Sequence, residues 1–318
     1  MSFLPRRQQV ILRIESVEGT AETLTAGDVI APILEAEWQP DITMAERNVL
    51  ASSLSPLAQI AAEQWATITF LTDLKAAGAS AGTVPPNLGV ALRACGMSET
   101  ISVGTSVTYA PVSSSFESAT IEIREGDTGA VAKIKQIVGA KGNVILEAEK
   151  GGLVAARFNF SGKYVEPTEG SLFADAASGP TPSPFLGVSF DFHGITTLKL
   201  RTVNIDLGNN VVRRNDINEI SGNFAALITD RNATATIDPE QELIATINFF
   251  NKLTTNAEGT LEYILGSGAG NIVTVNAPKA QIIADSEGDR DDFRIEDIEL
   301  QLNKDATAGD DELTIVFS

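Results

Sequence analysis

Residues 46–70, ERNVLASSLSPLAQIAAEQWATITF, return in altered form as residues 213–237, RRNDINEISGNFAALITDRNATATI. The two stretches align without a gap at a constant offset of 167 residues. The identical positions are Arg47, Asn48, Ala58, Ala66, Thr67 and Thr69, which recur as Arg214, Asn215, Ala225, Ala233, Thr234 and Thr236. Both stretches end in a segment, ATITF or ATATI, whose period is that of a β-strand. The match predicts that this strand and the long segment before it are duplicated.

A second match follows in the same order, because VGAKGNVI at 138–145 is similar to VNAPKAQI at 275–282. Chance similarity is the alternative explanation, since β-strands draw on few residue types. Residues 165–184, VEPTEGSLFADAASGPTPSP, show no strand or helix period and are rich in Pro, Gly, Ser and Ala. We therefore predict an N-terminal domain at 1–165 with a possible arm at 1–24, a linker at 166–184 and a C-terminal domain at 185–318.

Both halves have the pattern of mainly β domains. Alternating polar and apolar residues predict strands at 119–125, 143–149, 154–162, 197–207 and 295–302. Each half also offers one helix. The first, PNLGVALRACG at 86–96, ends in a glycine, and the second, DPEQELIATINFFNKL at 238–253, begins with Asp238 as its N-cap. The expected architecture is two β-domains, each with one helix on a sheet.

Composition and charge restrict the function. The chain has 318 residues, 43% of them hydrophobic, which is typical of a globular protein. No apolar run is long enough for a signal peptide or a membrane helix, so we expect a soluble protein made in the cytosol with no membrane partner. The net charge of −19 would repel nucleic acid, which argues against a protein that binds DNA or RNA specifically.

No motif for catalysis, a cofactor or a metal ion emerges. His193 is the single histidine and has no nucleophile signature near it. Cys95 is the single cysteine, which we expect to be a buried structural thiol. The acidic run 285–296 has Arg290 where a calcium loop needs glycine, and no Lys-Ser/Thr follows the glycine-rich 265–271. We predict that the protein is not an enzyme and has no cofactor.

Two predicted strands carry carboxylates on one side only. Glu147 and Glu149 alternate with Val144, Leu146 and Ala148, and Asp297 and Glu299 alternate with Ile298, Leu300 and Leu302. Alternation places the acids on one face of a sheet and the apolar residues on the other. An ordinary solvent-exposed face is one interpretation. The other is the wall of a passage through which something negatively charged slides.

Many phrases of the chain resemble the major tail tube proteins of long, non-contractile-tailed bacteriophages. They include IESVEGTAETLTAGDVI, LGVALRACGMSETISVGTSVTYAPVSSSFESATIEI, ARFNFSGKYVEP, VNIDLGNNVVRRNDINEISGNFAALITDRNATATID, GNIVTVNAPKAQI and GDDELTIVFS. The resemblance runs from about Ile14 to Ser318 and implies a β-sandwich or partial barrel flanked by a helix. Such domains would join edge to edge into a ring with one continuous inner β-barrel, and rings would stack into the tail.

The resemblance also implies a structural virion protein that conducts viral DNA, without binding it specifically, into the host. If the ring needs six domains and this chain has two, three chains would close a pseudo-sixfold ring; a hexamer with one outer domain is the alternative. Its other implied partners are a tape-measure protein and a tail terminator, with assembly in the host cytoplasm. Candidate residues of the acidic lumen are Glu147, Glu149, Asp297 and Glu299.

The long segments 39–59 and 207–226 occupy equivalent places in the two halves. In a tube they would project along the axis and contact the next ring, as the arm at 1–24 could also do. Candidate contact residues are Arg47, Arg213, Arg214 and Asp216. The alternative for these segments is an ordinary solvated loop.

The runner-up function is a two-domain β-sandwich that decorates the virion or binds carbohydrate on the host surface. Carbohydrate sites of this kind usually expose Trp and Tyr, because aromatic rings stack on sugars. The chain contains only two Trp and three Tyr, which argues against this function.

Overall fold

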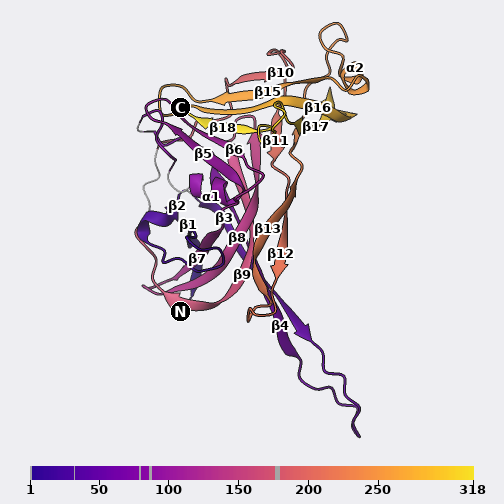
Figure 1. Cartoon of the computed structure of the whole chain (residues 1–318). Helices are drawn as coiled ribbons and strands as arrows, with labels where there is room; N and C mark the ends of the chain where they lie inside the picture. The colour runs from indigo at the N-terminus through magenta and orange to yellow at the C-terminus, as the bar shows by residue number, and fades with distance from the viewer. Residues whose placement is uncertain (1, 32, 79, 86–87, 176–179) are drawn as a thin grey trace.

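Alternating sequences along the chain form long antiparallel strands. The computed structural model describes residues 2–31, 33–78, 80–85, 88–175 and 180–318. Within them, sixteen strands belong to one large sheet, and two more form a separate pair. The first half lies at the lower left of Figure 1, in indigo to magenta, and the second half lies at the upper right. The mainly β fold predicted from the sequence is confirmed.

The elements of the first half are β1 (Phe3–Ile14), η1 (Ala26–Asp28), β2 (Val29–Ile30), β3 (Ile33–Ala45), β4 (Ile60–Asp73), α1 (Leu88–Ala94), β5 (Met97–Ser102), β6 (Ser106–Pro111), β7 (Ala119–Asp127), β8 (Ala132–Glu149) and β9 (Ala155–Gly170). The elements of the second half are β10 (Ser189–Phe192), β11 (Thr202–Asp206), β12 (Asn209–Asn215), β13 (Asn223–Arg231), β14 (Thr234–Ile237), α2 (Phe249–Thr254), β15 (Glu258–Leu265), β16 (Val273–Arg290), β17 (Phe293–Asn303) and β18 (Thr314–Phe317).

Four strands of each half follow the same order in space. In the first half the order is β3, β4, β9 and β8, and in the second it is β11, β14, β17 and β16. The two sets are joined by the pairing of β8 with β11, so a single sheet crosses the expected domain boundary. The prediction of separate domains therefore remains an interpretation of the repeat.

The duplicated stretches form strand pairs in the same register. In the first half Glu37 of β3 lies opposite Thr69 of β4. In the second half Asn204 of β11 lies opposite Thr236 of β14. The second pair is the first displaced by 167 residues on both strands. Register is fixed by which face of a strand is buried, so its repetition supports a true duplication over chance similarity.

The next strands also correspond. Thr67 of ATITF faces Ser161 of β9, and Thr234 of ATATI faces Gln301 of β17. Ser161 and Gln301 are therefore equivalent, with an offset of 140 residues. The offset is smaller than 167 because the second half is shorter between these strands.

The same offset applies to β8 and β16. Ser161 faces Lys141 of β8, and Gln301 faces Gln281 of β16. Matching 138–145 with 275–282 thus identified the correct strands but displaced them by three residues. A three-residue displacement would exchange the two faces of the strand, so the pairing and not the letters defines the alignment.

One hydrophobic core runs through both halves. Its buried members include Ile68, Phe70 and Phe158 of the first half and Ile237 and Leu300 of the second. The rings of Phe70 and Phe158 stack with centroids 5.1 Å apart. The core therefore holds the two halves together as well as packing each one.

Two elements differ from the sequence-based expectation at the start of the chain and in the linker. Residues 3–14, expected within an arm, form β1, which pairs with β7 and buries Val10, Ile11 and Leu12. Strand β9 continues to Gly170, so the first residues of the predicted linker are strand. The strand predicted at 197–207 forms only at 202–206.

The predicted helix at 238–253 is wrong over most of its length. Asp238 does not cap a helix; its side chain accepts hydrogen bonds from the main-chain N–H groups of Arg201 and Thr202 at 2.8 and 2.6 Å. Glu240 bridges to Ile295 of β17, which keeps this segment extended. The helix α2 begins only at Phe249. The first helix was predicted correctly as α1, although residues 86 and 87 lie outside the described part of the chain.

Candidate functional site

The four candidate acids lie on one face of the sheet. Glu147 of β8 lies opposite Asn204 of β11, which faces Thr236 of β14 on its other side. Thr236 in turn faces Glu299 of β17. Residues opposite each other in neighbouring strands project from the same face, so Glu147 and Glu299 share a row.

Glu149 and Asp297 extend this polar face by one further row. Glu149 lies opposite Thr202, two residues along β8 from Glu147. Asp297 lies two residues from Glu299 and opposite Ser286 of β16. Residues two apart on a strand share a face, so all four candidates belong to one surface, which we call the polar face.

Two of the four acids are paired with arginine. Glu147 Oε1 accepts a hydrogen bond from Arg157 Nε at 2.6 Å, and Glu149 Oε1 accepts one from Arg201 Nη2 at 2.5 Å. The Glu147 carboxylate raises the pKa of Arg157, and the Glu149 carboxylate raises that of Arg201. In the described chain no cation lies within ion-pair distance of Asp297 or Glu299. The uncompensated negative charge of these four residues thus lies on β17.

Sequence reasoning missed further acids of the polar face. Glu35 and Glu37 of β3 are exposed, and Glu37 lies opposite the face-lining Thr69. Asp206 of β11 accepts a hydrogen bond from Asn143 of β8 at 2.6 Å. The alternation of residues 33–39, ILEAEWQ, is the signal that could have identified Glu35 and Glu37.

The repeated ATITF and ATATI segments contribute hydroxyl groups to the polar face. Thr67 and Thr69 lie on it in the first half, while Ala66, Ile68 and Phe70 are fully buried. Thr234 and Thr236 take the same places in the second half. The repeat therefore writes the same arrangement twice, an apolar core side and a threonine-lined polar side.

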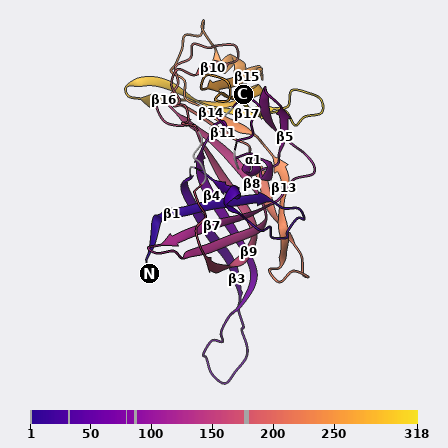
Figure 2. The ribbon, with the colours of Figure 1, turned by 90° about the vertical axis from the view of Figure 1, so that its left-hand side faces the viewer.

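The first long hairpin projects away from the body of the molecule. Strands β3 and β4 continue well beyond the sheet, and the tip at residues 46–59 lies far from the remaining chain (Figures 1 and 2). Leu50 and Leu54 at the tip are 106% and 105% exposed. Arg47, a candidate contact residue, lies on this tip and is exposed. Apolar side chains held so far into solvent indicate a surface that a partner covers.

The second long hairpin, β12–β13, lies against the first half, and it holds the other three candidate contact residues. Arg213 forms an ion pair with Asp41 and stacks over Trp65 at 5.5 Å. Arg214 lies 3.9 Å from Glu18.

Asp216 stabilises the turn of that hairpin. It accepts a hydrogen bond from the main-chain N–H of Asn218 at 2.9 Å, and its pKa is lowered mainly by that bond. Arg213, Arg214 and Asp216 thus make contacts within the chain, whereas Arg47 is presented on the projecting tip. Whether any of the four contacts another ring stays a prediction.

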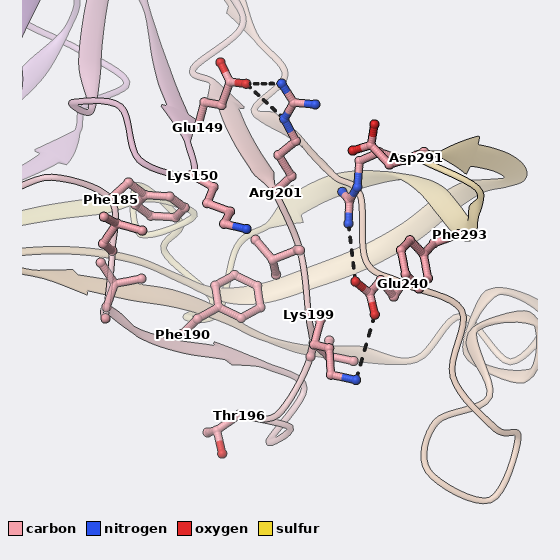
Figure 3. Close-up of a pocket in the computed structure, with 16 residues that line it drawn as sticks. Glu149, Lys150, Phe185, Phe190, Thr196, Lys199, Arg201, Glu240, Asp291 and Phe293 are labelled. Atoms are coloured by element: carbon pink, nitrogen blue, oxygen red, sulfur yellow. Dashed lines mark hydrogen bonds and ion pairs between the residues drawn. The ribbon is translucent and has the colours of Figure 1, made fainter.

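A hollow of about 780 Å³ lies near the end of β8 and β11 (Figure 3). Its charged groups are largely paired: Glu149 with Arg201, and Glu240 with both Lys199 at 3.8 Å and Arg290 at 3.9 Å. Arg290 also pairs with Asp238. Such mutual pairing leaves no nucleophile beside a base, so the hollow offers no catalytic arrangement.

The single histidine and cysteine have structural contacts. His193 Nε2 lies 2.9 Å from the carbonyl oxygen of Ala280, and burial lowers the pKa of the imidazole. Cys95 is buried, which raises the pKa of its thiol well above the usual range. Among the described residues no group of three or more His, Cys, Asp and Glu could hold a metal ion. In the same part of the chain no helix has the length and apolar character to span a membrane.

Comparison with known proteins identifies the family. A search of curated proteins returned no match. The family profile described as phage tail tube protein matches residues 5–314, which is nearly the whole chain. Members of that family are structural, non-enzymatic components of the virion that assemble into the tail tube. The chain belongs to the phage tail tube protein family.

Proposed function

We propose that three copies of this chain close into a ring in which each half acts as one tail-tube unit. The supporting observation is the repeated set of four strands, β3-β4-β9-β8 and β11-β14-β17-β16, in equal register. Each set would supply one sixth of a continuous inner barrel. Closing the barrel leaves no exposed strand edge in the ring.

The rival arrangement is a hexamer whose second half decorates the outside of the tube. In that arrangement the second half would need no strands in the lumen wall. Here β11 continues the sheet of the first half through β8, and Glu147 and Glu299 share one face. This continuity favours two wall-forming units in each chain.

The polar face would line the lumen and conduct viral DNA into the host. Phosphates bind a basic wall by releasing counterions, which would hold the genome in place. Carboxylates, threonine hydroxyls and amides instead keep water and ions between wall and duplex. Glu147 and Glu149 contribute through arginine-paired carboxylates, whereas Asp297 and Glu299 contribute uncompensated charge.

Stacking of rings would use the projecting β3–β4 hairpin. Its exposed Leu50 and Leu54 would be covered by the adjacent ring, near Arg47. The β12–β13 residues Arg213, Arg214 and Asp216 are closer to the body and would act as secondary contacts. In a tail of this kind assembled in the host cytoplasm, a tape-measure protein would occupy the lumen and a tail terminator would end the stack.

The lumen proposal is tested with charge variants at Asp297 and Glu299. These positions are preferable to Glu147 and Glu149, where substitution would also break an ion pair with arginine. We expect phage carrying Asp297→Lys and Glu299→Lys to form normal tails but to eject DNA more slowly, by roughly an order of magnitude. The matched Asp297→Asn and Glu299→Gln variants remove charge without adding a phosphate-binding group and should eject nearly normally. Unchanged ejection kinetics in the double-lysine phage would contradict the assignment of this face to the lumen.

A further inference from the structure

The two halves of the chain meet in a strand junction of defined register. Residues 145–149 of β8 lie antiparallel to residues 202–206 of β11, with Glu147 opposite Asn204. Since the halves are equivalent, this internal junction shows how one unit can join the next. It therefore serves as a template for contacts between copies.

Main-chain hydrogen bonds define which pairs of the junction are hydrogen-bonded. Lys150 N donates to Arg201 O at 2.8 Å, and Leu207 N donates to Val144 O at 3.1 Å. Hydrogen-bonded and non-hydrogen-bonded pairs alternate along an antiparallel ladder. Every second pair counted from these two is hydrogen-bonded, so the Glu147 pair is of the non-hydrogen-bonded type.

The counterpart of β11 in the first half is β3. Residues 202–206 correspond to residues 35–39 at the offset of 167, and both segments pair with the repeated threonine strand. Strand β11 pairs on its other side with β8. Among the described residues β3 pairs with β4 alone, so its outer edge is open.

The counterpart of the β8 segment lies at the end of β16. Arg157 of β9 faces Ile145, and its equivalent in β17, Asp297, faces Ser286. A β-bulge inserts one residue into β16 just before this point, so the offset becomes 141 here. Residues 286–290 therefore correspond to the part of β8 that pairs with β11, and in the described chain they pair with β17 alone.

The geometry points to a junction between copies in which residues 286–290 of one chain pair antiparallel with residues 35–39 of a second copy. The register is that of β8 and β11. It places Ser286 opposite Gln39, Glu287 opposite Trp38, Gly288 opposite Glu37, Asp289 opposite Ala36, and Arg290 opposite Glu35. This pairing deepens the proposed ring and rests on it.

Charge complementarity supports this register at its far end. Arg290 takes the place of Glu149, and Glu35 that of Thr202. Opposite charges would thus face each other in a non-hydrogen-bonded pair, where side chains are closest. Within the chain the equivalent end is also closed by an ion pair, between Glu149 and Arg201.

Unpartnered polar atoms on the two edges also complement each other. The indole Nε1 of Trp38 is buried and has no hydrogen-bond partner in the described chain. Both carboxylate oxygens of Asp285 and the Oε2 of Glu296 are equally without a partner at the end of the second half. The register brings the Trp38 edge to this acidic cluster, directly opposite Glu287, which lets an N–H donor meet carboxylate acceptors.

Pro40 fixes where the junction ends. It stands at the position of Leu207, whose N–H donates to Val144 in the internal junction. Proline has no N–H, so the ladder between copies cannot extend past Gln39. A proline at an edge also hinders uncontrolled strand addition, which keeps single chains from pairing in other registers.

Disulfide trapping tests the register with four substitutions combined in pairs. Gln39→Cys with Ser286→Cys, and Glu37→Cys with Gly288→Cys, join residues expected to be opposite in non-hydrogen-bonded pairs, the geometry that suits a disulfide. Gln39→Cys with Gly288→Cys, and Glu37→Cys with Ser286→Cys, combine the same substitutions two residues out of register. The native Cys95 is fully buried and does not compete. Tubes are assembled under reducing conditions, oxidised mildly and analysed on non-reducing gels.

We expect both in-register variants to be converted to covalent trimers, and the out-of-register variants to link at least tenfold less. Microscopy of the same samples separates the two levels of the hypothesis. Normal tubes without linkage in either in-register variant, or stronger linkage out of register, would overturn the pairing while leaving the tube intact. A wild-type chain that forms no tubes would instead count against the proposed function.

Discussion

The hairpins β3–β4 and β12–β13 occupy equivalent places in the two halves but are used differently. The first projects far from the body, whereas the second lies along the strands of the first half (Figure 1). Ala225 and Ala226 of the second hairpin are fully buried, while the equivalent Ala58 and Gln59 are exposed. The second hairpin has found its partner within the chain, and the first awaits an equivalent surface in another copy.

A bend at Gly208 accounts for the difference in direction. Gly208 has a φ of 68°, and a Cβ built on it would lie 2.0 Å from the carbonyl oxygen of Asn232. The equivalent residue in the first hairpin is Asp41, where β3 continues through its pairing with Trp65. Only glycine tolerates both the left-handed backbone and the close approach, so the bend is encoded at one position.

The bend is the most sensitive point of the comparison. We expect Gly208→Ala to lower the free energy of unfolding by about 3 kcal/mol or more, because it adds backbone strain and a main-chain clash. Gly187→Ala is the matched control, since Gly187 has a φ of 63° with open space around it, and should cost about 1 kcal/mol. Chemical denaturation of both variants measures the difference. Equal losses would mean that the close approach to Asn232 does not hold the second hairpin.

The two halves also differ in one buried charge. Glu296 of β17 takes the place of Ala156 of β9, and its pKa is raised to about 7 by burial, then by Asp285 and Glu287, against a smaller opposing hydrogen bond from Gln241. A carboxyl whose folded pKa exceeds its unfolded value of 4.5 favours folding when protonated, so stability falls as the pH rises from about 4.5 through 7.

Glu296→Gln removes this dependence. For the unassembled chain we expect the variant to be more stable than wild type by on the order of 1 kcal/mol at pH 8, and equally stable near pH 4. Thermal unfolding across this pH range provides the measurement, with Glu299→Gln, an exposed acid on the same strand, as the control. A stability gain that is constant with pH would exclude ionisation of Glu296 as its cause.

The projecting tip should affect assembly without affecting the fold. Leu50→Ser with Leu54→Ser should change the free energy of unfolding by less than about 0.5 kcal/mol, because both side chains are already in solvent. The same variant should form few or short tubes, since stacking loses its apolar contact. Ile217→Ser, at the equivalent place in the second hairpin and 99% exposed, is the control and should reduce tube length less. Equal reductions would show that both hairpins contribute alike to stacking.

Much of the fold could be predicted because it depends on local alternation. The strand at ATITF, its repeat at ATATI, and the acids Glu147, Glu149, Asp297 and Glu299 all follow from residues two apart sharing a face. The repeat gave the correct register of β3–β4 and β11–β14, because no insertion separates those strands in either half.

The remaining features depend on contacts between distant segments. Asp238 has the local signature of a helix cap, but its carboxylate is taken by Arg201, Thr202 and Arg290. The pairing of Glu147 with Arg157 joins two strands and depends on their register. The joining of both halves into one sheet was likewise invisible in the sequence, because it depends on β8 extending past its own half.

The number of chains in one ring tests the central claim most directly. A cross-section of the assembled tube, obtained by electron cryomicroscopy at a resolution that separates strands, should show three chains. Each should contribute two equivalent four-stranded units to the inner wall, joined between copies by β16 and β3. Six chains in a ring, or three chains whose second halves lie outside the wall, would contradict the account.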